Sequence, residues 1–274
     1  MSVPQVLLNN GVEIPQIGMG VWRVPAARAR EVVARALELG YRHVDTASLY
    51  GNEEGVGQAV RESGLDRDAV FVTSKVWNDD QGYDATLRAF DTSMAKLGFE
   101  VLDLYLIHWP AGGRGLTTQT WRALERLYLD GRVRAIGVSN FEPHHLQRLL
   151  DRVEVVPAVN QVELHPYLQQ HEVRAANAAH GIVTEAWSPL AKGGELLGDP
   201  VITRIARKHE RTPAQVVLRW HLDHDTVVIP KSVTPSRMEE NLDALGFELD
   251  EEDLRRIDGL DRGLRVGPHP DHVA

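Results

Sequence analysis

The stretch that decides the fold is residues 102–138, LDLYLIHWPAGGRGLTTQTWRALERLYLDGRVRAIGV. Its apolar runs at 102–107 and 133–138 are short and rich in branched side chains, as in strands that are buried on both faces. Between them, residues 118–129 repeat apolar side chains at helical spacing. A strand, a helix and a second strand in this order predict a βαβ unit with parallel strands.

The same alternation runs along the whole chain. Further short apolar runs predict strands near 14–18 and at 43–44, 70–72, 156–159, 182–186 and 226–229. Helical spacing predicts helices at 27–39, 54–62, 83–97, 143–150 and 172–180, two more within 199–224, and a last one at 250–257. Eight strands with intervening helices close most naturally into a (β/α)8 TIM barrel, here one domain over 1–274 with extra helices near the C-terminus.

Two local features refine this expectation. Residues 6–14 alternate around Asn9-Asn10-Gly11, which predicts an N-terminal β-hairpin that plugs the bottom of the barrel. The main rival is an open doubly wound sheet. It is disfavoured because no G-x-G-x-x-G motif follows an early strand.

Composition excludes several classes of protein. The chain has no cysteine, so disulfides and thiolate sites are excluded, and a reducing cytoplasm is the expected compartment. A formal net charge of −9 argues against a nucleic-acid partner. The first residues lack the pattern of a signal peptide, and no apolar run reaches the ~20 residues of a membrane span.

Reactive side chains recur just past the predicted strand ends, where barrel enzymes carry their active sites. Asp45 and Tyr50 follow the second strand, Lys75 ends the third and His108 ends the fourth. Because tyrosine is a weak acid with a pKa of about 10, we expect Lys75 to lower the pKa of Tyr50. Asp45 would keep Lys75 charged, and His108 would hydrogen-bond a substrate oxygen. The set predicts protonation of a carbonyl oxygen while a cofactor supplies hydride.

Ordered motifs across nearly the whole chain resemble those of the aldo-keto reductase family. They are DTASLYGNE at 45–53, TSKVW at 73–77, DLYLIHWP at 103–110, GVSNF at 137–141, NQVELHP at 160–166 and IPKS at 229–232. GNEEGVG at 51–57 and HPDHV at 269–273 are closest to bacterial reductases of the 2,5-diketo-D-gluconate type. The resemblance implies a barrel that is usually monomeric, binds NADPH and needs no metal, with Asp45, Tyr50, Lys75 and His108 as the catalytic residues.

The resemblance also implies a site for NADPH. Ser139, Asn140 and Gln161 would hydrogen-bond the nicotinamide carboxamide, and Trp187 would stack on the ring, where the family often has tyrosine. The remaining contacts would come from Ser188, Pro189 and Leu190 at the pyrophosphate, from Lys231, Ser232, Val233, Thr234 and Arg237 at the 2′-phosphate, and from Glu240 and Asn241 near the adenine. A charge-assisted contact of Arg237 with the 2′-phosphate, worth about 1.5–3 kcal/mol, would favour NADPH over NADH.

Aromatic side chains are expected to form the substrate pocket. Trp22, Trp77, Trp109 and Trp187 each follow a predicted strand and would build an apolar wall around a small carbonyl, beside His108. The segment between Trp109 and Thr118 is short and rich in glycine, which predicts an open site. Small aldehydes, α-dicarbonyls or keto-sugars are the expected substrates.

Two alternative interpretations remain. His144-His145 and the pair His269/His272 do not combine the usual spacing of metal ligands with a third ligand, so a solvated surface is favoured over a metal site. The alternative function is that of a cofactor-binding regulatory or structural protein on the same fold, because a fold alone does not fix an activity.

Overall fold

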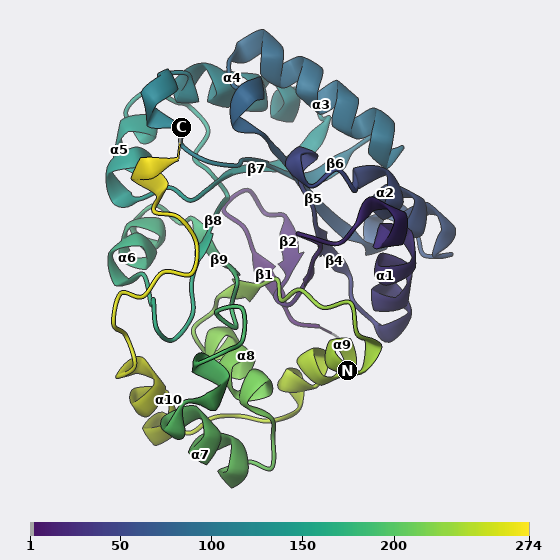
Figure 1. Ribbon diagram of the computed structural model, residues 1–274. Helices are drawn as coiled ribbons and strands as arrows, with labels where there is room; N and C mark the ends of the chain where they lie inside the picture. Colours follow the sequence, from purple (N-terminus) through teal and green to yellow (C-terminus); the bar gives the residue numbers. More distant parts are fainter. Residues whose placement is uncertain (1–2, 274) are drawn as a thin grey trace.

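The computed structural model describes residues 3–273, and its centre is a ring of parallel strands (Figure 1). Eight strands neighbour one another in chain order: β3 Met19–Gly20, β4 His43–Asp45, β5 Phe71–Val76, β6 Leu102–Ile107, β7 Val133–Ser139, β8 Val159–Glu163, β9 Val183–Trp187 and β10 Val227–Val228. Ile17, just before β3, forms a parallel bridge with Val228 of β10. This bridge closes the sheet, and the predicted (β/α)8 barrel is confirmed.

Helices surround the strands on the outside of the barrel (Figure 1). Their bounds are α1 Ala26–Leu39, α2 Glu53–Glu62, α3 Tyr83–Leu97, α4 Thr117–Leu129, α5 Pro143–Leu150, α6 His171–Ala179, α7 Pro200–Lys208, α8 Pro213–Asp223, α9 Pro235–Leu242 and α10 Glu251–Asp258. Local sequence fixes several of their ends. Gly40 ends α1 with a φ of 108° that favours glycine, and Thr212 caps α8 through a reciprocal bond with Gln215.

The N-terminal hairpin covers the amino ends of the barrel strands. Strand β1 (Gln5–Leu7) pairs antiparallel with β2 (Glu13–Pro15). Between them, Asn9 Nδ2 donates to the Pro157 carbonyl and Asn10 Nδ2 to the Arg134 carbonyl, both at 2.9 Å. Since these carbonyls lie at the starts of β8 and β7, the hairpin closes the bottom of the barrel as predicted.

The barrel interior changes from apolar to polar along the strands. Its lower layer is a buried cluster of hydrophobic residues: Leu8, Ile14, Phe71, Leu104, Leu106, Ala135, Ala158, Val159 and Val227. A larger cluster fills the space between strands and helices and includes Trp121 and Trp220. Inside the barrel, His43, Lys75 and Glu185 are fully buried polar residues. His43 begins β4 and contacts the Pro15 carbonyl of the hairpin, whereas Lys75 lies near the carboxyl end of β5, so buried polar groups extend from the bottom layer up to the carboxyl ends of the strands.

Three segments differ from the sequence-based expectation. Ile14 belongs to the hairpin, and the first barrel strand begins only at Met19. The strand predicted at 156–159 instead runs from Val159 to Glu163, because Pro157 has no N–H to donate to a neighbouring strand. Helix α9 begins at Pro235 and carries mostly exposed polar side chains, so apolar spacing did not reveal it.

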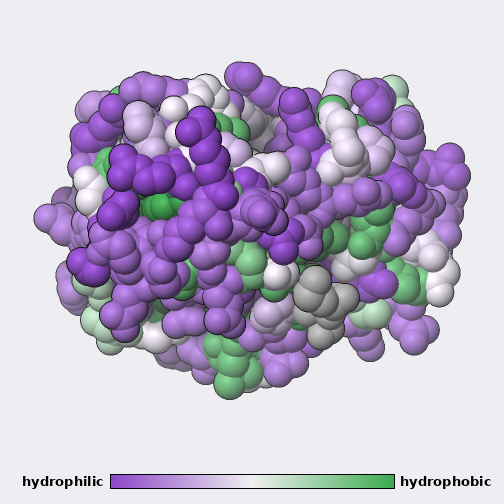
Figure 2. All heavy atoms as spheres, turned by 90° about the horizontal axis from the view of Figure 1, so that it is seen from below, coloured by the Kyte–Doolittle hydropathy of each residue, from purple (hydrophilic) through white to green (hydrophobic). Residues whose placement is uncertain are grey.

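The face of the molecule that is seen from below carries mostly polar side chains. Figure 2 shows a face that is mostly hydrophilic, with small and separate hydrophobic patches. Within residues 3–273, no helix has both the length and the apolar character that crossing a bilayer demands.

We expect Gly57→Ala to destabilise the barrel. Gly57 lies in α2 against the backbone of Leu97 at the end of α3, and a Cβ at this position would collide with the Leu97 carbonyl. The same carbonyl accepts a hydrogen bond from Arg61, so it has little room to move. Overpacking of this kind costs about 1–3 kcal/mol, which corresponds to a Tm lower by roughly 2–10 °C in a thermal melt.

The control is Glu54→Ala, an exposed position on the same helix. It should leave Tm nearly unchanged. A Gly57→Ala protein that melts with or above the wild type would contradict the close packing of α2 on α3.

Candidate active site

A buried lysine organises the polar end of the barrel. Lys75 Nζ lies 2.7 Å from both carboxylate oxygens of Asp45 and 3.0 Å from the Thr46 carbonyl. It also lies 3.4 Å from the hydroxyl oxygen of Tyr50. Lys75 and Asp45 come from the neighbouring strands β5 and β4, and Tyr50 comes from the short turn Ser48–Tyr50 after β4. The structure therefore brings together three of the four predicted catalytic residues around one ammonium group.

The pKa of Tyr50 departs from the sequence-based expectation in direction. Burial raises the pKa of Tyr50, and the opposing effect of the Lys75 charge does not overcome it. For Lys75, burial acts to lower the pKa, but the charge of Asp45 outweighs it and the net pKa is raised. A protonated hydroxyl therefore lies beside a charged ammonium. The prediction that Lys75 lowers the pKa of Tyr50 is wrong, because burial of the hydroxyl has the larger effect and could not be read from the sequence.

His108 completes the predicted catalytic set. It follows β6, is 7% exposed, and its ring lies 5.7 Å from that of Tyr50, centroid to centroid. Burial, reinforced by the nearby Lys75 charge, lowers the pKa of His108 well below its usual value, so the imidazole is neutral. Its Nδ1 has no hydrogen-bond partner among residues 3–273. A neutral imidazole can donate one hydrogen bond to a ligand oxygen.

A second buried carboxylate lies behind the ion pair and was missed in the sequence. Gln161 Nε2 donates to Asp45 Oδ2 at 2.7 Å and to Glu185 Oε2 at 2.9 Å. Burial, with a further contribution from Asp45, raises the pKa of Glu185 to about 8. Glu185 is therefore neutral at pH 7. Both amide hydrogens of Gln161 are used here, which leaves its Oε1 as the acceptor for a ligand amide.

The residues predicted to contact the nicotinamide form a connected chain. Asn140 Nδ2 donates to the His108 carbonyl at 3.0 Å and to Ser139 Oγ at 3.1 Å. Trp187 Nε1 donates to Asn140 Oδ1 at 2.8 Å. The indole N–H therefore fixes the orientation of the ring that is predicted to stack on the cofactor. Asn140 also has a φ of 64°, a left-handed backbone that asparagine tolerates better than most residues.

The C-terminal tail supports Trp187 from behind. The buried carboxylate of Glu163 accepts hydrogen bonds from the backbone N–H groups of Val266 and Gly267, the latter at 2.9 Å, and lies 3.1 Å from His165 Nε2. Gly267 packs so closely on Trp187 that a Cβ would collide with the indole. Glu163 lies within a quoted motif, but only the structure connects it to a segment about a hundred residues away.

The predicted phosphate-binding residues gather at the start of α9. Lys231, Thr234 and Arg237 are exposed, whereas Ser232 is buried and accepts from the Thr234 N–H at 3.1 Å. Neither Lys231 nor Arg237 forms an ion pair within residues 3–273. Two unpaired cations next to a helix N-terminus suit an anionic group such as a 2′-phosphate.

The other residues predicted to bind the cofactor lie around this helix and after β9. Asn241 is buried, Val233 is half-buried, and Glu240 accepts from Thr212 Oγ1 at 2.6 Å, which ties it to the cap of α8. After β9 come Ser188, with a φ of 49°, the buried Pro189 and the half-buried Leu190.

The tryptophans predicted to line the substrate pocket differ in exposure. Trp22 is 42% exposed and contacts the guanidinium of Arg23 over its ring at 4.3 Å. Trp77 is half-buried and lies 5.2 Å from His108, ring centroid to centroid, whereas Trp109 is 9% exposed. The ring contact of Trp77 with His108 links one of these tryptophans directly to the predicted catalytic set.

Comparison with known proteins agrees with this geometry. The model of the aldo/keto reductase family matches residues 16–262. The glyoxal reductase of Bacillus subtilis (strain 168) is 53% identical, with 98% of this chain and 96% of the relative covered. The methylglyoxal reductase DkgA of Yersinia pestis is 48% identical with the same coverage. Gox0644, solved as a mutant in complex with NADPH, is 50% identical over 100% of both chains with a TM-score of 0.95. The chain belongs to the aldo/keto reductase family.

Proposed function

We propose that this protein reduces small aldehydes, α-dicarbonyls or keto-sugars to alcohols with NADPH, and that Tyr50 is the general acid. The observation that carries the proposal is the Lys75 ammonium, held by Asp45 and 3.4 Å from the Tyr50 hydroxyl oxygen. NADPH would supply the hydride, and the side chains handle the proton.

Tyr50 is suited to donating a proton at neutral pH. Its raised pKa keeps the hydroxyl protonated, so the acid form is always present. As the proton leaves, negative charge develops on the phenol oxygen, and the Lys75 ammonium is already in place to stabilise it. Neutral His108 would hold the carbonyl oxygen near this hydroxyl. The barrel interior excludes water from the Lys75–Asp45 pair, which strengthens these interactions.

The preference for NADPH is proposed from the charges at α9. Lys231 and Arg237 would bind the 2′-phosphate, which NADH lacks. Gln161, Ser139 and Asn140 would hold the nicotinamide amide, with Trp187 against the ring. The complex of the similar protein Gox0644 with NADPH supports NADPH as the cofactor.

The proposed substrate range rests on the pocket and on the relatives. Relatives named glyoxal reductase and methylglyoxal reductase favour α-dicarbonyls. The predicted tryptophan wall would offer an apolar surface for a compact substrate. The motifs at 51–57 and 269–273, which resemble those of 2,5-diketo-D-gluconate reductases, favour keto-sugars as well.

We expect Tyr50→Phe to lower kcat for methylglyoxal by at least about 100-fold, because the proton donor is lost. NADPH affinity, measured by fluorescence titration, should change less than about twofold because the phenyl ring remains. Turnover is followed as loss of NADPH absorbance.

Tyr83→Phe, which removes an exposed hydroxyl outside the site, is the matched control and should keep the wild-type rate. A Tyr50→Phe enzyme with wild-type kcat would eliminate Tyr50 as the acid. If the wild type binds NADPH tightly but turns over no member of a carbonyl panel, the chain is a cofactor-binding regulatory protein instead.

We expect Arg237→Ala to weaken NADPH binding by roughly 10- to 100-fold and NADH binding far less, because only NADPH carries the charge that the guanidinium would bind. Dissociation constants for both cofactors give the comparison. Arg207→Ala on α7, a surface arginine outside the predicted cofactor site, is the control. Equal weakening of both cofactors would refute the assignment to the 2′-phosphate.

We expect Glu185→Gln to change the pH profile of kcat at alkaline pH only. Well below pH 8 the wild-type carboxyl is mostly protonated, so glutamine mimics it. Above pH 8 the wild-type carboxylate ionises, raises the pKa of Tyr50 further and slows proton donation. Wild-type kcat should therefore fall above pH 8 while the variant stays flat. Profiles that coincide from pH 6 to about pH 10 would show that Glu185 does not act on Tyr50.

A further inference from the structure

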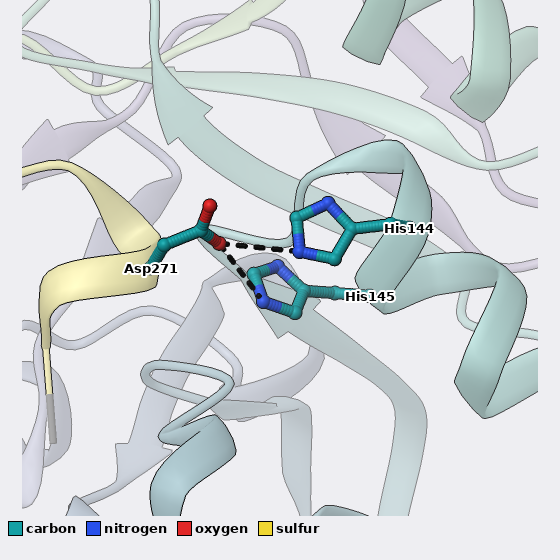
Figure 3. A group of neighbouring side chains, drawn as sticks. All are labelled: His144, His145 and Asp271. Carbon is teal, nitrogen blue, oxygen red and sulfur yellow. Dashed lines mark ion pairs between the residues drawn. The ribbon is translucent and has the colours of Figure 1, made fainter.

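Two histidines and an aspartate from distant parts of the chain meet in one group, which includes none of the residues of the site described above (Figure 3). His144 and His145 lie in the first turn of α5, and Asp271 lies in the short turn Pro270–His272 near the C-terminus. Asp271 Oδ1 is 3.2 Å from His144 Nε2 and 3.3 Å from His145 Nε2. The sequence contained no third ligand close to either histidine pair, and the fold supplies one.

The spacing of these atoms matches a tetrahedral metal site. The three ligand atoms all lie within 4.8 Å of one another. Bonds of about 2.0–2.2 Å from zinc to nitrogen and oxygen, at tetrahedral angles, place neighbouring ligand atoms roughly 3.3–3.6 Å apart. The two nitrogen–oxygen separations are already close to that range, so small side-chain movements suffice.

We propose that His144, His145 and Asp271 bind a zinc ion, with water as the fourth ligand. Two imidazoles and one carboxylate are donors that Zn²⁺ accepts readily and that Mg²⁺, which prefers oxygen, does not. The site is separate from the catalytic residues, so it stands whether or not the proposed reductase activity does.

The rest of the tail holds the site in shape before any ion binds. Arg265 donates to Glu142 Oε1 at 2.7 Å, and Glu142 is the residue before α5. Pro270 is buried, which anchors the turn that carries Asp271. Binding therefore orders little additional chain and loses little conformational entropy.

One hydrogen bond opposes zinc at His145. Its Nδ1 accepts the backbone N–H of Glu142 at 3.2 Å, which places the ring proton on Nε2. Zinc at Nε2 requires that proton on Nδ1, so this long bond is lost. The loss lowers affinity by up to about tenfold, which points to moderate rather than very tight binding.

The experiment is calorimetric titration of the untagged, full-length protein with zinc chloride, alongside thermal melts. The wild type should bind one zinc ion per chain and gain roughly 5 °C in Tm at a zinc concentration 100 times Kd. His144→Ala and Asp271→Asn should each lose at least about tenfold in affinity and most of the Tm gain. Titration with magnesium chloride should give no heat of binding, and magnesium should leave Tm unchanged.

The matched control is His171→Ala. His171 Nε2 lies 3.3 Å from Asp261 Oδ2, a similar contact between one histidine and one carboxylate. It should bind zinc like the wild type. Absence of zinc binding by the wild type, or equal binding by the His144→Ala and Asp271→Asn proteins, would overturn the proposal. Circular dichroism of each variant confirms that lost binding is not lost folding.

Discussion

The ion pair between Lys75 and Asp45 is the constraint on which the polar end of the barrel depends. Two charges taken out of water cost several kcal/mol each unless other groups satisfy them. Strand pairing places Asp45 beside Thr73, and Lys75 lies two residues farther along β5, hence on the same face. The Thr46 carbonyl, Tyr50 and Gln161 complete the contacts of the pair. The arrangement proposed to be catalytic is thus also the one that compensates the cost of burying these two charges.

The barrel interior is apolar near the amino ends of the strands, and the Lys75–Asp45 pair lies toward their carboxyl ends. Branched apolar side chains and the N-terminal hairpin fill the bottom of the barrel. At the opposite rim the strands end in side chains that can hydrogen-bond, and the C-terminal tail adds support through Glu163 and Trp187. Stability and chemistry therefore use different layers of the same eight strands, and substitutions at the rim need not disturb the lower core.

Much of this arrangement could be predicted from the sequence, for a simple reason. Strand periodicity and the position just past a strand are local properties, so the barrel and residues such as Asp45 and His108 were predictable. Burial and long-range contacts are not local. The pKa of Tyr50 is raised rather than lowered, because its desolvation depends on how the whole barrel packs around it. Glu185 and Gly267 escaped notice because their partners lie 24 or more residues away in the chain.

The bridge between Ile17 and Val228 affects the order in which the barrel folds during synthesis. It joins positions 211 residues apart, and both strands at this seam contain only two residues. Contacts that distant form late, because the entropy of closing so long a loop must be overcome first. During synthesis, six longer strands can pair before the final seam exists. The half-built sheet then exposes an open edge, which makes rapid arrival of β10 important for avoiding aggregation on the ribosome.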